Sequence, residues 1–126
     1  MDQKTLIVVL SDPRPGTEEA LGRVFNALAM AYDLQQRGRP VSLVFQGTGT
    51  RWVAELRKKS HPAHALYAEV SAKIDGVCGG CADIFGATEE AEEAHLPLLR
   101  DVKVPGTGGL TSLGRYLEDG YRVISF

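Results

Sequence analysis

A continuous apolar run near the start of the chain, residues 5–10 (TLIVVL), limits the fold more than any other feature. The run is rich in β-branched residues and shows no alternation of apolar and polar side chains. Such a run is typical of a strand buried on both faces, as strands are in parallel sheets covered by helices. The sequence therefore predicts a parallel sheet and an α/β class of fold.

A long amphipathic helix is predicted over residues 17–37, where apolar residues recur at helical spacing. Glu18 and Glu19 lie in its first turn and Gly38 follows its end, as is typical of helix termini. A second apolar run, residues 41–45 (VSLVF), comes directly afterwards. A strand, a helix and a second strand in this order predict a right-handed crossover between parallel strands.

The same alternation continues to residue 126. In order, the patterns predict a helical segment over 50–72 broken at Pro62, a strand over 73–77, a short helix ending at Gly86, an acidic helical turn capped by Thr88, a weaker strand over 98–104, a helix over 110–117 and a strand over 121–126. We therefore expect a single α/β domain spanning residues 1–126, with an open, mostly parallel five-stranded sheet and helices on both faces. The expected topology is doubly wound and flavodoxin-like.

In sheets of this kind, ligands bind at the carboxyl ends of the strands, near the switch point in strand order. Three loops follow the first three predicted strands and would converge there. They predict a pocket lined by Ser11, Asp12, Gln46, Gly47, Thr48 and Gly79.

The two cysteines, Cys78 and Cys81, are separated by two glycines at the end of the third predicted strand and just before a helical segment. A thiol acts as a nucleophile in its thiolate form, and a helix N-terminus lowers the pKa of a thiol placed there. Asp75 and Asp83 would raise the same pKa. We predict that Cys78 is the catalytic nucleophile and that Cys81 either resolves the intermediate or is packed.

Several kinds of chemistry use paired cysteines. No metal or other cofactor is predicted, because the histidines do not complete a ligand set of suitable spacing. Dithiol redox chemistry is feasible, although the motif follows the third strand rather than the first and no aromatic residue precedes it. In sulfur transfer, Cys78 would carry a persulfide. A fourth interpretation is that the cysteines are small buried apolar residues without a chemical role.

The charge pattern argues against some partners. The formal net charge is −2 and the basic residues are scattered, so neither a nucleic acid nor a membrane surface is expected as a partner. The first residues lack the features of a signal peptide and no segment approaches the length of a membrane span. We therefore expect a cytoplasmic protein.

Three further segments carry a resemblance to a known family: residues 44–47 (VFQG), residues 76–86 (GVCGGCADIFG) and the closing residues 117–126. With the first strand and long helix, they resemble the DsrE/DsrF-like family of sulfur-relay proteins. The resemblance implies a five-stranded parallel sheet, homo-oligomers of trimeric or hexameric size, sulfur-donor or sulfur-acceptor protein partners, and an active cysteine in the loop after the third strand. Cys78 matches that cysteine, and Cys81 is a departure from a lone cysteine.

Two functions follow from this sequence. The first is a cytoplasmic sulfur carrier or sulfurtransferase-like protein that holds a persulfide on Cys78. The second is a non-enzymatic oligomeric module that binds a small ligand or partner, with structural or redox-sensing cysteines.

Overall fold

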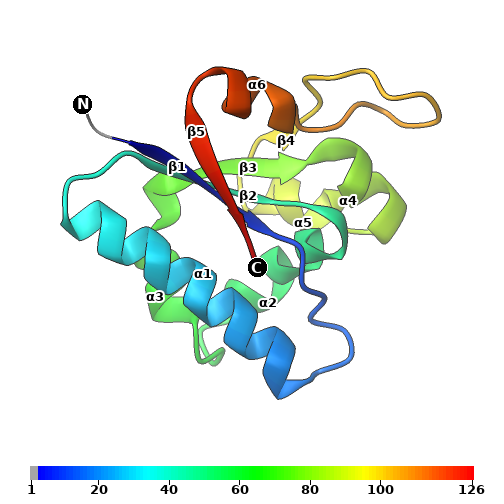
Figure 1. Ribbon diagram of the computed structural model, residues 1–126. Coiled ribbons are helices and arrows are strands. Elements are labelled where there is room, and N and C mark those ends of the chain that lie inside the picture. The colour runs from blue at the N-terminus through cyan, green and yellow to red at the C-terminus, as the bar shows by residue number, and fades with distance from the viewer. Residues whose placement is uncertain (1–2) are drawn as a thin grey trace.

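The computed structural model describes residues 3–126 and contains a five-stranded, all-parallel sheet with the strand order β4-β3-β2-β1-β5 (Figure 1). The strands are β1 (Lys4–Val9), β2 (Val41–Phe45), β3 (Ile74–Cys78), β4 (Leu98–Leu99) and β5 (Tyr121–Ser125). The α-helices are α1 (Glu18–Gln36), α2 (Trp52–Leu56), α3 (His64–Glu69), α4 (Gly79–Phe85), α5 (Thr88–Glu93) and α6 (Leu113–Glu118), with 3₁₀ turns η1 (Gly47–Arg51) and η2 (Ser71–Lys73). The predicted parallel α/β sheet is confirmed.

The strand order explains how the helices are distributed. From β1 to β4 each strand is added on the same side of its predecessor, and β5 then returns to pair with β1. Because crossovers are right-handed, steps in one direction place their helices on one face and the reverse step places its helix on the other. Helices α1, α2, α3 and α5 contribute to the larger core cluster, whereas α6 packs on the opposite face (Figure 1).

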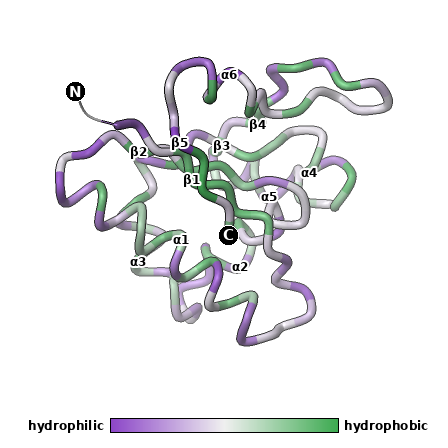
Figure 2. Tube along the Cα trace, in the orientation of Figure 1, coloured by the Kyte–Doolittle hydropathy of each residue, from purple (hydrophilic) through white to green (hydrophobic). Residues whose placement is uncertain are grey.

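The hydrophobic core is divided by the sheet. The larger cluster includes Ile7 and Phe45 from the strands and Leu28 from α1, all without exposed surface. The smaller cluster, under α6, centres on Leu6 and Val44. Figure 2 shows the strongest hydrophobic colouring along the strands, whereas hydrophobic and hydrophilic residues alternate along α1. This alternation is expected of a helix that covers a sheet with one face.

The ends of α1 follow the predicted signals. Thr17 is the N-cap and its side chain accepts a hydrogen bond from the Ala20 N–H at 3.1 Å, and Arg37 is the C-cap. The prediction that Thr88 caps the next acidic helix was wrong. Ala87 occupies the N-cap of α5, and the Thr88 hydroxyl instead donates to the Asp83 carboxylate at 2.8 Å.

The predicted strand over 98–104 is much shorter, because only Leu98 and Leu99 pair with β3. The chain then leaves the sheet as a loop over residues 100–112, which we call the β4–α6 loop. Its two arms are joined by an antiparallel bridge between Val102 and Leu110. Within residues 3–126, no helix is both long and apolar enough to cross a membrane.

Candidate thiol site

Cys78 is the last residue of β3 and the N-cap of α4, so it directly precedes a helix as the sequence predicts. Phe45 and Val77 are paired across β2 and β3, and both face the larger core cluster. Side chains alternate along a strand, so the next residues, Gln46 and Cys78, turn toward the α6 face of the sheet. Cys78 has 0% exposed surface, whereas Cys81, in the first turn of α4, is partly exposed.

The two thiols interact directly, and their pKa values shift in opposite directions. The Cys81 S–H donates a hydrogen bond to the Cys78 sulfur, and this bond is the main reason why the pKa of Cys78 is lowered. Burial opposes the shift, and the nearby backbone and hydroxyl of Thr111 reinforce it. The pKa of Cys81 is raised, first because its proton is held by Cys78 and then by burial. Cys78 is therefore the thiolate of the pair.

The β4–α6 loop covers the start of α4. The Gly80 N–H donates to the Gly109 carbonyl at 2.7 Å. A Cβ atom on Gly80 would lie 2.9 Å from the same carbonyl oxygen, closer than packed atoms allow. The absence of a side chain at Gly80 therefore permits residues 109–111 to pass directly over the cysteine pair.

An ion pair holds the same loop against α4 from outside. Arg100 donates to both carboxylate oxygens of Asp83, at 2.8 and 3.1 Å, and to the Gly108 carbonyl at 3.3 Å. The Arg100 guanidinium and then the Thr88 hydroxyl lower the pKa of Asp83. The expectation that Asp83 raises the thiol pKa is thus not supported, since its charge is neutralised by Arg100. The sequence analysis did not identify Arg100.

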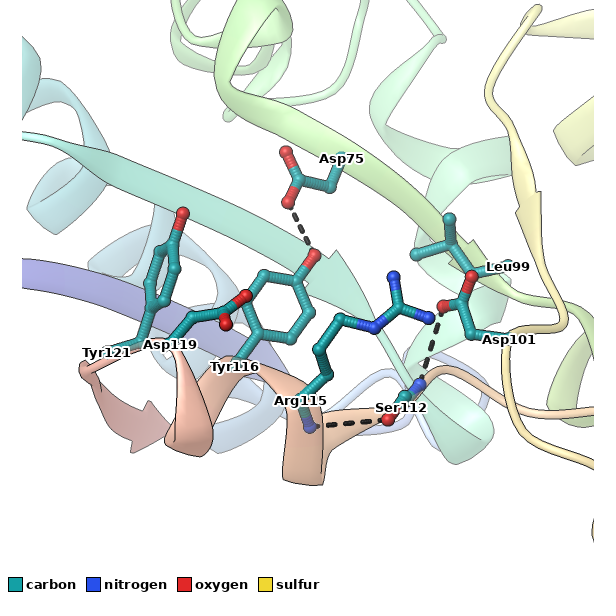
Figure 3. A pocket seen from close by; sticks show the side chains of 8 residues that line it. All are labelled: Asp75, Leu99, Asp101, Ser112, Arg115, Tyr116, Asp119 and Tyr121. Carbon is teal, nitrogen blue, oxygen red and sulfur yellow. Dashed lines mark hydrogen bonds between the residues drawn. The ribbon is translucent and has the colours of Figure 1, made fainter.

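Asp75, the other carboxylate expected to affect the thiol, lies in a separate hollow on the α6 face (Figure 3). The hollow has a volume of about 310 Å³, and the Tyr116 hydroxyl donates to the Asp75 carboxylate there at 2.5 Å. Burial and this hydrogen bond raise the pKa of Tyr116. Neither cysteine lines the hollow, whose walls are Asp75, Leu99, Asp101, Ser112, Arg115, Tyr116, Asp119 and Tyr121.

The predicted pocket residues divide into two groups. Ser11 and Asp12 lie away from the thiols, where the carboxyl ends of β1 and β5 border a hollow of about 410 Å³. Both have structural partners, because the Trp52 indole N–H donates to the Ser11 carbonyl at 2.8 Å and to its hydroxyl at 3.1 Å, and Asp12 pairs with Arg51 at 2.9 Å. The switch in strand order lies between β1 and β5, and the hollow beside Ser11 and Asp12 is lined by neither cysteine.

The other group lies close to the thiols. The Gly47 backbone is within hydrogen-bonding reach of Cys81, Gly79 is the buried first residue of α4, and Gln46 precedes Gly47. Thr48 belongs to the same turn, but its hydroxyl donates to the Leu10 carbonyl at 3.1 Å. Gln46, Gly47 and Gly79 thus share the site with Cys78 and Cys81.

Thr111 was not identified from the sequence, although it lies beside Cys78 and is only 4% exposed. The available signal was the glycine-rich turn over residues 106–109, which the sequence places before a helix. Among residues 3–126, no group of three or more His, Cys, Asp or Glu side chains has the arrangement of a metal site.

The opposite shifts of the two thiols predict a titration in two well-separated steps. Absorbance of thiolate near 240 nm should show one thiolate per chain at pH 7, because Cys78 has ionised while Cys81 retains its proton. The second thiolate should appear only well above pH 9, beyond the range of an ordinary thiol. The Cys78→Ser variant should lose the early step. Two overlapping steps near pH 8.5 in the unmodified protein would contradict this prediction.

Taken together, the structure is that of a parallel α/β protein with a buried thiolate, Cys78, at the end of the third strand and a partly exposed thiol, Cys81, beside it. The chain belongs to the DsrE/DsrF-like family, whose family model matches residues 3–126. The chain is also 30% identical over 101 residues to the uncharacterized protein MJ0733 of Methanocaldococcus jannaschii, an alignment that covers 80% of this chain and 78% of that protein. No solved structure gives a significant match. The family membership indicates a role related to sulfur relay.

Proposed function

We propose that the protein is a cytoplasmic sulfur carrier that holds a persulfide on Cys78. The observation that carries this proposal is the hydrogen bond from the Cys81 S–H to Cys78, which favours the anionic form of a nucleophilic sulfur. Membership of the DsrE/DsrF-like family supports the same conclusion.

Loading requires no net oxidation when the donor is itself a persulfide. The Cys78 thiolate attacks the outer sulfur of the donor, a new S–S bond forms at Cys78, and the S–S bond within the donor breaks. The donor leaves as a thiolate and takes up a proton. In delivery, the thiolate of an acceptor attacks the outer sulfur on Cys78, and the Cys78 thiolate leaves.

The burial of Cys78 restricts how a donor reaches it. Cys81 is partly exposed and lies on the approach, whereas Cys78 lies beneath residues 109–111 of the β4–α6 loop. We propose that the donor protein displaces this loop. The contacts that would yield are the Gly80 to Gly109 hydrogen bond and the Arg100 to Asp83 ion pair.

The test is peptide-level mass spectrometry after incubation with a sulfane-sulfur donor, with persulfides trapped by alkylation. Added sulfur should appear on Cys78 in the unmodified protein. It should persist in Cys81→Ser, whose hydroxyl still donates a hydrogen bond, and disappear in Cys78→Ser. A Cys78 to Cys81 disulfide without added sulfur would instead identify dithiol redox chemistry.

The complete burial of Cys78 favours a second candidate, a non-enzymatic module that binds a small ligand or partner. In that case both thiols would remain inert to the donor. The double substitution of Cys78 and Cys81 by serine would then leave ligand binding and assembly intact.

Assembly into a homotrimer or homohexamer remains part of the proposal, together with sulfur-donor and sulfur-acceptor protein partners. Apolar side chains on the surface support assembly, among them Phe25 and Leu117, which are 42% and 61% exposed. Val123, on the edge strand β5, is 38% exposed.

A further inference from the structure

Two buried polar side chains beside Cys78 have atoms without a hydrogen-bond partner among residues 3–126. They are the Oε1 atom of Gln46 and the Oγ1 atom of Thr111, in residues that are 6% and 4% exposed. A buried polar group without a partner costs about 1–3 kcal/mol, so native structures contain few of them. Both orphaned atoms lie on elements that border the same cysteine.

The positions of these two residues follow from the fold. Phe45 and Val77 are paired across neighbouring parallel strands, and both face the larger core cluster. Gln46 and Cys78 are the next residues along the chain. Because side chains alternate along an extended chain, both turn toward the α6 face. Thr111 reaches this face from the β4–α6 loop, whose Gly109 carbonyl is anchored by the Gly80 N–H. Cys78 therefore has two polar residues as neighbours, Gln46 directly after β2 and Thr111 in the β4–α6 loop.

The chemistry of the two atoms is complementary. The Thr111 hydroxyl is a donor that an anionic sulfur can use, and the Gln46 Oε1 atom is an acceptor for an S–H proton. A thiolate on Cys78 requires the donor alone. An added outer sulfur, which exists as an anion or with a proton, can use both.

We propose that Thr111 and Gln46 form a subsite for the outer sulfur atom of a Cys78 persulfide, with Thr111 also donating to the Cys78 thiolate before loading. The inference rests on the proposed function and adds the two residues that stabilise the carried atom. Bound in this subsite, the outer sulfur has partners for both of its protonation states and is held away from water.

The first test needs no added sulfur. Thr111→Val keeps the shape of the side chain and removes the hydroxyl, and it should raise the pKa of Cys78 by about one unit, measured by absorbance near 240 nm. Thr111→Ser keeps the hydroxyl and should titrate like the unmodified protein. Thr5→Val is the matched control, because Thr5 is also a buried threonine, 1% exposed, but its hydroxyl accepts from Arg122 on β5. Unchanged titration of Thr111→Val would overturn the role of Thr111.

The second test measures how long the outer sulfur is retained. The protein is loaded with inorganic polysulfide and treated with cyanide, which attacks the outer sulfur, breaks the S–S bond and releases thiocyanate and the Cys78 thiolate. Thr111→Val and Gln46→Met should each release thiocyanate about tenfold faster than the unmodified protein, and Thr5→Val should not. Equal rates in all loaded proteins would overturn the subsite while leaving the sulfur carrier intact. If the unmodified protein accepts no sulfur, the subsite fails together with the proposed function, and the titration alone decides whether Thr111 stabilises the thiolate.

Discussion

Replacing Gly49 by alanine should destabilise the protein by about 3 kcal/mol, at the upper end of the range for overpacking. Gly49 is a buried residue of η1 that packs directly on the end of β1. A Cβ atom there would overlap the Val9 carbonyl oxygen and lie 2.8 Å from the Val9 carbonyl carbon and 3.2 Å from the Leu10 Cα. All three are backbone atoms, and the Val9 carbonyl also accepts the Gln46 N–H at 2.9 Å. The clash can be relieved only by moving backbone, either at the end of β1 or in η1.

The measurement is urea unfolding, with the Gly22→Ala variant as the control. Gly22 lies within α1, has no atom within 4 Å of an added Cβ, and is not held at a positive φ. Alanine there should stabilise the protein by about 0.5–1 kcal/mol through helix propensity and reduced entropy of the unfolded chain. The two substitutions are chemically identical and should shift the unfolding midpoint in opposite directions. Similar midpoints for both variants would refute the close packing of Gly49.

The second large effect is expected at Cys81. Cys81→Ala removes the hydrogen bond that contributes most to the lowered pKa of Cys78, so that pKa should rise by about one to two units. Cys81→Ser retains a hydrogen-bond donor and should keep most of the shift. The ratio of thiolate to thiol near pH 6 should therefore fall by about tenfold to a hundredfold in the alanine variant, as measured by absorbance near 240 nm. If both substitutions raised the pKa of Cys78 equally, the hydrogen bond from Cys81 would not be the cause of the lowered pKa.

The same substitution should alter how stability depends on pH. The pKa of Cys78 is lower in the folded protein than in the unfolded chain, where a thiol titrates near 8.5. The thiolate therefore contributes stability that is fully present above the unfolded pKa and is lost as the pH falls through the folded pKa. Cys81→Ala should reduce this contribution, so the variant should show a smaller rise in stability between acidic and mildly alkaline pH.

Much of the fold is predictable because its signals are local. The first strand, the long helix and the second strand follow from residues 5–45, where apolar spacing agrees with the acidic first turn and with Gly38 after the helix. The strand predicted over 98–104 was too long, because the apolar pattern does not reveal that only Leu98 and Leu99 have a neighbour to pair with. Pairing depends on tertiary contacts that a local pattern does not contain.

The thiol site was only partly predictable for the same reason. Cys78 and Cys81 are recognised from their own spacing, and Gln46 from its place after a strand. Thr111 and Arg100 belong to a loop that is far from the cysteines in the sequence, so local spacing does not connect them with the site. Thr111 lies beside Cys78, and Arg100 holds the loop against α4 through its ion pair with Asp83. Strand order also placed Ser11 and Asp12 beside β5, which a list of strands without their spatial order does not indicate.

Thr111 follows both cysteines in the sequence, so it is synthesised after them. The cysteines leave the ribosome before the β4–α6 loop and β5 do, so a nascent chain lacks both the cover of residues 109–111 and the β5 neighbour of β1. While the chain is still unfolded, both thiols have an ordinary pKa and are mostly protonated at neutral pH. Folding brings Cys81 to Cys78, and the docking of Thr111 then completes the lowering of the Cys78 pKa, so the order of synthesis leaves part of the activation of this thiol to a late segment of the chain.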